Sequence, residues 1–240
     1  QGFTILQLTP FAADLGSRKK VGPRYEYTGL LKAYVKELRR LFKAGQLQLD
    51  DGTVVTAEQF NENEPLRVYD TGYTPDKLHY YPKKFDPSTH GGKLKPEILN
   101  AEQTSATPGW HILLVEDVVQ IPRQGQDEVK PAGRQQLEAN QTASSLLEKF
   151  TNDDQYRHEV GLTPDDWLIY ALNRLQKEKK VTDDFQGKGS ICYLLGSYIP
   201  SIGYVPVASW HRGHERAYLG DRNPDARYVY VGARSAVRIS

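Results

Sequence analysis

The sequence contains one cysteine, Cys192, among its 240 residues. One cysteine cannot form an internal disulfide, which excludes the small secreted domains that disulfides hold together. The sequence also has no array of cysteines and histidines of the kind that forms a structural zinc site. Because Cys192 lies in an apolar segment typical of a buried strand, we expect its thiol to be buried and unreactive.

Long apolar runs and an excess of one charge are missing as well. Uninterrupted apolar stretches such as residues 112–115 are far shorter than the roughly 18 residues that cross a bilayer, so no membrane span is expected. The 31 basic and 30 acidic residues give a net charge of +1, from which we expect no nucleic-acid partner. The first ten residues do not resemble a signal peptide, so a cytoplasmic location is predicted, with display at a cell surface left open.

Three segments have the apolar periodicity of amphipathic helices. In residues 28–44 apolar side chains recur at steps of three and four, and Gly45 follows, as is common after a helix. Residues 164–179 follow Thr163, a favourable N-cap residue, and start with a proline. A shorter helix is predicted over residues 143–150.

Strands are predicted mainly in the second half of the chain. Residues 61–109 are rich in proline and tyrosine and indicate long ordered loops. Alternating or continuous apolar residues predict strands over residues 110–119, 191–195, 205–210 and 232–239, and a polar loop over residues 124–134. The segment between the last two strands has no clean period.

Two groups of residues could carry chemistry, and each has a plainer explanation. His211 and His214 lie three residues apart beside Glu215, which could form a metal-dependent site, but a third ligand and a defined supporting element are not evident. After residue 188 the chain has six arginines, no lysine and several tyrosines, which could bind single-stranded nucleic acid or simply form a loop surface. We expect neither a resident metal nor another cofactor.

The C-terminal region resembles a known family. It reads GSICYLLGSY over residues 189–198, VPVASWHRG over residues 205–213 and ERAYLGDRNPDARYVYVGARSAVR over residues 215–238. This order of segments is similar to the variable proteins of diversity-generating retroelements, which have a C-type lectin fold of the formylglycine-generating-enzyme type. Residues 109–117 and 161–168 support the resemblance more weakly, so that it covers roughly residues 109–240.

The resemblance implies a ligand-binding receptor without catalytic activity. In that family, copying errors at template adenines diversify the residues of the binding face while the scaffold residues stay fixed. Formylglycine-generating enzymes use a pair of active-site cysteines, and the single Cys192 argues against that activity. An enzyme of that type, or a metal-dependent activity at His211 and His214, is the alternative function. The expected ligand is a protein or another macromolecule, bound by Trp210, His211, Arg212, His214, Tyr218, Gly220, Asp221, Arg222, Ala226, Tyr228 and Tyr230.

The expected architecture follows from the helices, the strands and the resemblance together. We predict an α+β chain with a small, twisted, mostly antiparallel sheet that two helices flank, in a C-type-lectin-like fold with long loops. Residues 109–240 would form this module, with a variable region over residues 204–230. Residues 1–108 would pack on it as an N-terminal elaboration. Trp210, Tyr218, Tyr228 and Tyr230 would be the aromatic anchors of the binding face, because large rigid rings give contact area at a low entropic cost.

Overall fold

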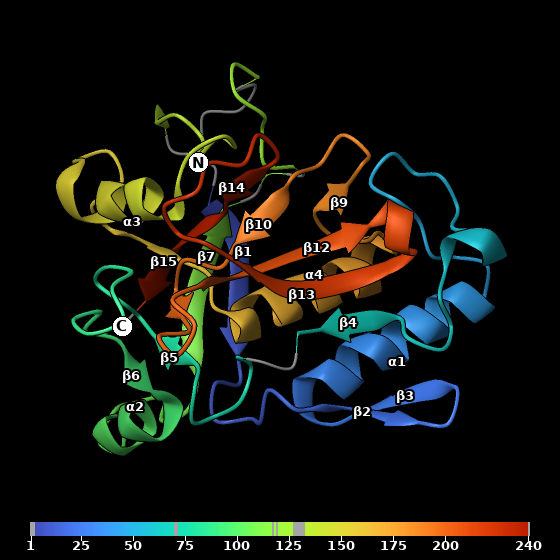
Figure 1. Cartoon of the computed structure of the whole chain (residues 1–240), viewed down its shortest axis with the longest axis horizontal. Helices are drawn as coiled ribbons and strands as arrows, with labels where there is room; N and C mark the ends of the chain where they lie inside the picture. The colour runs from blue at the N-terminus through green and yellow to red at the C-terminus, as the bar shows by residue number, and fades with distance from the viewer. Residues whose placement is uncertain (1–2, 70–71, 117, 119, 127–132, 240) are drawn as a thin grey trace.

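Two sheets and two long helices form the body of the chain, as Figure 1 shows. The computed structural model describes residues 3–69, 72–116, 118, 120–126 and 133–239. The class is α+β and most strand pairs are antiparallel, as predicted. No helix in the described part of the chain is both long and apolar enough to span a membrane.

The first sheet joins strands from both ends of the chain. Its order is β1-β7-β15-β8, and every pair is antiparallel. The strand predicted over residues 110–119 forms its second member, although Asp117 and Val119 lie outside the described residues. The four strands are β1 (Phe3–Thr9), β7 (His111–Glu116), β15 (Ser235–Ile239) and β8 (Glu159–Gly161).

The second sheet is built on a long hairpin and contains both parallel and antiparallel pairs. β12 (Val205–His211) and β13 (Arg216–Arg222) form the hairpin, and β10 (Ile191–Tyr193) pairs antiparallel with β12. Three short strands pair in parallel: β14 (Val231–Ala233) and β4 (Leu66–Val68) at the two edges, and β9 (Asp184–Phe185) at the end of β12. The prediction for residues 205–210 is confirmed, whereas the strand expected over residues 191–195 is shorter.

The single strand expected over residues 232–239 is wrong, because two strands of different sheets occupy this segment. β14 belongs to the hairpin sheet and β15 to the four-stranded sheet. Arg234 lies between them and is fully buried. Its guanidinium donates hydrogen bonds to the carboxylate of Asp183, so the chain passes from one sheet to the other around a buried ion pair. The expected single sheet is therefore two sheets.

The two long helices confirm their predictions and pack against each other. α1 (Gly29–Lys43) and α4 (Pro164–Glu178) contact through rings such as Tyr34 and Trp167, whose centroids are 5.9 Å apart. Thr163 caps α4, accepting a hydrogen bond from the backbone N–H of Asp166 at 3.2 Å. Together the helices cover one face of the hairpin sheet (Figure 1). α3 (Ala143–Asn152) is two residues longer than predicted and covers part of the other face.

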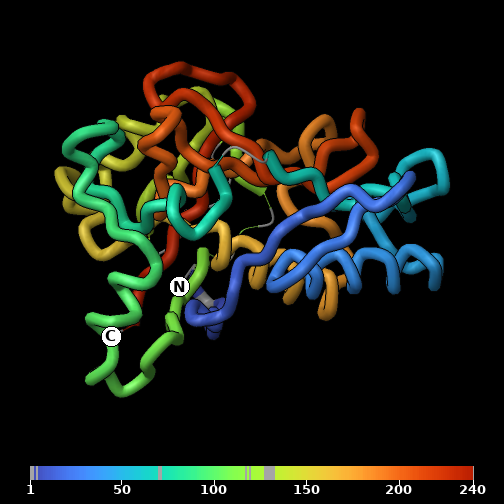
Figure 2. Tube along the Cα trace, turned by 60° about the horizontal axis from the view of Figure 1, so that its bottom comes forward, coloured from blue at the N-terminus to red at the C-terminus, as the bar shows by residue number. Residues whose placement is uncertain are grey.

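The first hundred residues take part in both sheets. β1 pairs with β7, and β4 pairs with β13. Residue 108 is thus not a boundary between sheets. Figure 2 shows this region from another side, with a hairpin lying beside α1. The remaining elements are this hairpin of β2 (Arg18–Val21) and β3 (Arg24–Tyr27), the small sheet of β5 (His79–Tyr80), β6 (Lys93–Leu94) and β11 (Ser197–Tyr198), α2 (Lys95–Ala101) and the 3-10 turns η1 (Ala57–Gln59) and η3 (Arg212–His214).

Candidate functional site

The candidate site is the face of the β12–β13 hairpin that the long helices do not cover. In β13, Ala217 and Leu219 point into the core, where α1 and α4 pack. The alternate residues Tyr218, Gly220 and Arg222 therefore lie on the opposite face, since successive side chains of a strand point to opposite sides. This alternation places the tyrosine and the arginine of β13 on one surface.

One half of this surface is a group of contacting rings around Tyr218. The ring of Tyr69, which follows β4, meets the ring of Tyr218 edge to face, with centroids 5.3 Å apart, and the two hydroxyls are hydrogen-bonded. The rings of His211, at the end of β12, and His214, in η3, have centroids 4.1 Å apart, and each centroid lies 6.2 Å from that of Tyr218.

Phe185 connects these rings to a second group in the loop that precedes β14. Its ring centroid lies 5.0 Å from that of His211 and 4.9 Å from that of Tyr230. The ring centroids of Tyr230 and Tyr228 are 6.4 Å apart, and the guanidinium of Arg222 lies 5.7 Å from the Tyr228 ring centroid. The rings thus form one continuous surface, which we call the aromatic face; it consists of Tyr69, Phe185, His211, His214, Tyr218, Tyr228 and Tyr230.

The loop that carries Tyr228 and Tyr230 is held to the rest of the chain by hydrogen bonds. The hydroxyl of Ser144, in α3, donates to the carboxylate of Asp225 at 2.6 Å. The backbone N–H of Ser144 donates to the carbonyl of Pro224 at 3.1 Å. Asn140 donates its backbone N–H to the carbonyl of Tyr228 at 3.2 Å. These bonds fix both ends of the loop, so its two tyrosines are presented in a defined position.

His211 and Tyr218 are uncharged at neutral pH, whereas the guanidinium groups of Arg67 and Arg222 lie 6.0 and 5.7 Å from the ring centroids of Tyr69 and Tyr228. Burial and the neighbouring His214 lower the pKa of His211 to about 4, so its imidazole is uncharged at neutral pH. Burial and the hydrogen bond to Tyr69 raise the pKa of Tyr218 to about 12, which keeps its hydroxyl protonated. Uncharged rings flanked by arginines suit contact with another protein surface, since tyrosine and arginine are enriched at such interfaces.

Two of the predicted site residues are not at the surface. Trp210 is 1% exposed and stacks on Phe60 in the core, with centroids 6.3 Å apart. It faces α4 because its side chain alternates with that of His211 along β12. Gly220 is buried beneath the rings of Tyr69 and Tyr218, and a Cβ at this position would come within 2.9 Å of both. The expectation that Trp210 and Gly220 contact a ligand is therefore wrong.

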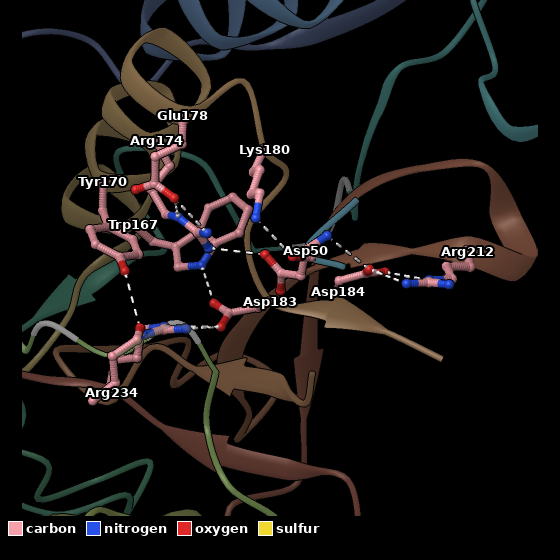
Figure 3. A network of polar contacts seen from close by, with 11 residues as sticks. Asp50, Trp167, Tyr170, Arg174, Glu178, Lys180, Asp183, Asp184, Arg212 and Arg234 are labelled. Atoms are coloured by element: carbon pink, nitrogen blue, oxygen red, sulfur yellow. Dashed lines mark hydrogen bonds and ion pairs between the residues drawn. The ribbon is translucent and has the colours of Figure 1, made fainter. Parts of the chain in front are cut away.

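Arg212 is at the edge of the site but is engaged in a buried network (Figure 3). Its guanidinium donates to the carboxylate of Asp184 at 2.6 and 2.8 Å and to that of Asp51 at 2.9 Å. Hydrogen bonding to Asp184 raises the pKa of Arg212 above its usual value. The same network includes the Arg234–Asp183 pair, so Arg212 anchors the β12–β13 turn to the core.

The other predicted residues lie where a ligand can reach them. His214 is exposed, and the remaining residues are partly exposed along β12, β13 and the following loop. Asp221 lies in β13 on the same side as Ala217 and Leu219, and Ala226 lies in the loop after β13; both are partly exposed. The accessible predicted residues besides His214 are His211, Arg212, Tyr218, Asp221, Arg222, Ala226, Tyr228 and Tyr230.

The geometry also bears on the two chemical alternatives. Within the described ranges, no three histidine, cysteine, aspartate or glutamate side chains lie close enough together to hold a metal ion. His211 and His214 face each other as rings inclined at 38°. The thiol of Cys192 is fully buried, as predicted, and burial raises its pKa well above the usual range. Such a thiol is a poor nucleophile, because the thiolate is the reactive form.

The sequence reasoning missed two rings of the aromatic face. Tyr69 belongs to the tyrosine-rich segment before residue 109. The composition of this segment predicts that its rings pack on a surface, but it does not identify that surface. Phe185 lies in a polar stretch of the sequence, and its position depends on the parallel pairing of β9 with β12. Both residues reach the site through contacts between segments that are distant in the sequence. The spacing of apolar residues along the chain does not predict such contacts.

Searches against family models, curated proteins and solved structures gave no match for this chain.

Proposed function

We propose that the chain is a non-catalytic ligand-binding protein, and that its aromatic face binds a protein or another macromolecule. The observation that carries this proposal is the continuous surface of rings on the open side of the β12–β13 hairpin. Tyrosine-rich surfaces on a rigid support are what binding proteins use, since each ring offers a large contact area with few rotatable bonds.

We further propose that this face is diversified, as in the variable proteins of diversity-generating retroelements, on a C-type-lectin-like fold. The support comes from the arrangement of the segments that carry the resemblance. Ser209 and Trp210 lie in β12, Arg216 and Ala217 begin β13, and residues 223–227 form the loop that follows it. These segments surround the aromatic face, and the partly exposed residues alternate along them with buried scaffold residues.

The experiment that tests the proposal is to sequence the DNA downstream of the coding region. We expect a near-copy of the stretch that encodes residues 204–230, differing from it almost only where the copy has adenine, next to a reverse transcriptase gene. The adenine positions should coincide with codons for exposed residues such as Tyr218 and Tyr230, and should avoid the codon for Trp210.

A downstream region with neither the copy nor the reverse transcriptase gene would overturn diversification. Stoichiometric metal in elemental analysis of the purified protein, lost on mutation of His211 and His214, would overturn the non-catalytic proposal in favour of the metal-dependent alternative. The two results are independent, so each part of the proposal can fail on its own.

A further inference from the structure

Positive charge is concentrated in one short segment, although the net charge of the chain is only +1. Residues 18–43 contain nine basic residues and two acidic ones, Glu26 and Glu37. The rest of the chain has the remaining 22 basic and 28 acidic residues, a net charge of −6. We expected no nucleic-acid partner from the net charge of +1. That net charge conceals the separation of a basic segment from an acidic remainder.

The fold places these charges on one surface. The β2–β3 hairpin lies alongside α1, as Figure 2 shows. Lys32, Lys36 and Lys43 are exposed on α1, at steps of four and seven residues, which puts them on one side of the helix. Lys20 and Arg24 are exposed on the hairpin. Within the described residues, none of these five side chains forms an ion pair, so their charges are not neutralised internally.

A groove runs between the hairpin and the helix. It consists of two adjoining hollows of about 420 and 520 Å³, which share Tyr25, Glu26 and Arg39 as a common wall. Arg24 and Lys43 line the first hollow, and Lys32 and Lys36 line the second. The ring of Tyr25 is partly exposed, and the guanidinium of Arg18 lies 4.6 Å from its centroid. The groove therefore combines a row of cations and two carboxylates, Glu26 and Glu62, with a partly exposed aromatic ring.

We propose that this groove binds single-stranded nucleic acid. The cations from Lys32 to Lys43 extend over about 16 Å of helix, at 1.5 Å per residue, which suits contact with several successive phosphates. An accessible tyrosine among cations suits a base that stacks on it. The concave shape fits a strand better than a flat bilayer, and an acidic peptide would make no use of the ring.

This groove is separate from the aromatic face. Its lining residues lie between Val21 and Lys43, together with Glu62, whereas the aromatic face is formed by the outer side of the β12–β13 hairpin, Tyr69 and Phe185. Binding of nucleic acid in the groove therefore does not depend on the proposed function. Substitution of Tyr218, Tyr228 and Tyr230 by alanine should leave it unchanged.

The test uses the whole chain and a fluorescein-labelled 20-nucleotide oligothymidylate, with fluorescence anisotropy at several salt concentrations. We expect binding that weakens as salt rises, with a slope of log K against log salt of about −2 to −3 if three or four phosphates are contacted. Lys32→Gln combined with Lys36→Gln should reduce the steepness of that slope by about 1.4. Tyr25→Leu should lower the affinity about tenfold and leave the slope unchanged.

A matched control is Lys83→Gln combined with Lys84→Gln, which removes the same charge from exposed lysines elsewhere and should leave binding unchanged. The proposal is overturned if the oligonucleotide does not bind at 50 mM salt, or if the control weakens binding as much as the groove variant does. It is also overturned if phosphatidylserine vesicles bind while the oligonucleotide does not. Both lysine pairs are exposed, so these variants keep the test valid even where Tyr25→Leu fails to fold.

Discussion

The guanidinium of Arg234 donates two hydrogen bonds, of 3.0 and 2.8 Å, to the same carboxylate oxygen of Asp183 at the point where the chain passes between its two sheets. Both side chains are fully buried. The other oxygen of Asp183 accepts a hydrogen bond from the indole N–H of Trp167 at 2.8 Å. One carboxylate thus ties α4 to the junction of the two sheets (Figure 3).

Asp183→Asn should destabilise the protein severely. It leaves the Arg234 guanidinium buried without its counter-charge, a change that costs about 3–5 kcal/mol in other proteins. Urea unfolding followed by circular dichroism measures the loss. Glu37→Gln, which breaks the ion pair of Glu37 with the exposed Arg40, is the control and should cost less than about 1 kcal/mol. Equal losses in the two variants would contradict the structural importance of the buried pair.

Trp210 and the tyrosines of the aromatic face should differ sharply in their effect on stability. Trp210→Ala removes a fully buried ring from the core and should cost about 3–5 kcal/mol. Tyr218→Ala, Tyr228→Ala and Tyr230→Ala, made singly, remove partly exposed rings and should each cost about 1 kcal/mol. Thermal unfolding of the four variants provides the comparison. A tyrosine variant as unstable as Trp210→Ala would place that ring in the core.

Gly220→Ala should disturb the aromatic face from below. The added methyl group would come within 2.9 Å of the rings of Tyr69 and Tyr218, and crowding of this kind costs roughly 1–3 kcal/mol. Tyr69→Leu should relieve the crowding, because it removes one of the two rings. A double-mutant cycle on the free energy of unfolding should therefore show that the two substitutions together cost less than their sum. Strict additivity would mean that the methyl group is accommodated elsewhere.

The stability of the protein should depend on pH through His111. This imidazole is 3% exposed, stacks on Phe11 and is hydrogen-bonded to the hydroxyl of Tyr81 at 2.8 Å. Burial lowers its pKa to about 3. Between pH 6.5 and 3 the unfolded chain binds a proton at His111 that the folded chain does not. The free energy of unfolding that is present above pH 6.5 therefore decreases as the pH falls.

The measurement compares the wild type with His111→Gln in urea at pH 7, 6, 5 and 4. The unfolding free energy of the wild type should fall relative to that of the variant by up to about 1.4 kcal/mol per pH unit below 6.5. The comparison cancels groups common to both proteins, including Asp50, whose pKa burial raises to about 6 with the opposite effect on stability. Parallel curves would show that the pKa of His111 is the same in the folded and the unfolded protein.

Local patterns in the sequence were enough to predict the helices and one strand of the site. α1 and α4 have apolar residues at helical spacing on their buried sides, and β12 has a continuous apolar run. β13 was missed because its outward positions hold Tyr218 and Gly220, so that the contrast between its two faces is weak. The break at Arg234 was missed because β14 and β15 continue the same alternation and only the distant Asp183 separates them.

For the candidate site too, local sequence identified some of the residues but not how they are arranged. Residues within the tail could be listed from the sequence, but their depth could not, since Trp210 and His211 are neighbours that face opposite sides of β12. Phe185 and Tyr69 complete the face from other parts of the chain. Their contribution depends on the parallel pairings of β9 and β4, which join segments far apart in sequence.

The alternation along β13 also bears on how the protein can evolve. Ala217 and Leu219 contribute to the folding free energy, whereas Tyr218 and Arg222 contribute mainly to the outer surface. On the proposed function, selection for a stable fold and selection for a new specificity therefore act on alternate codons of the same short stretch. A lineage could replace its specificity many times over while keeping the same margin of stability.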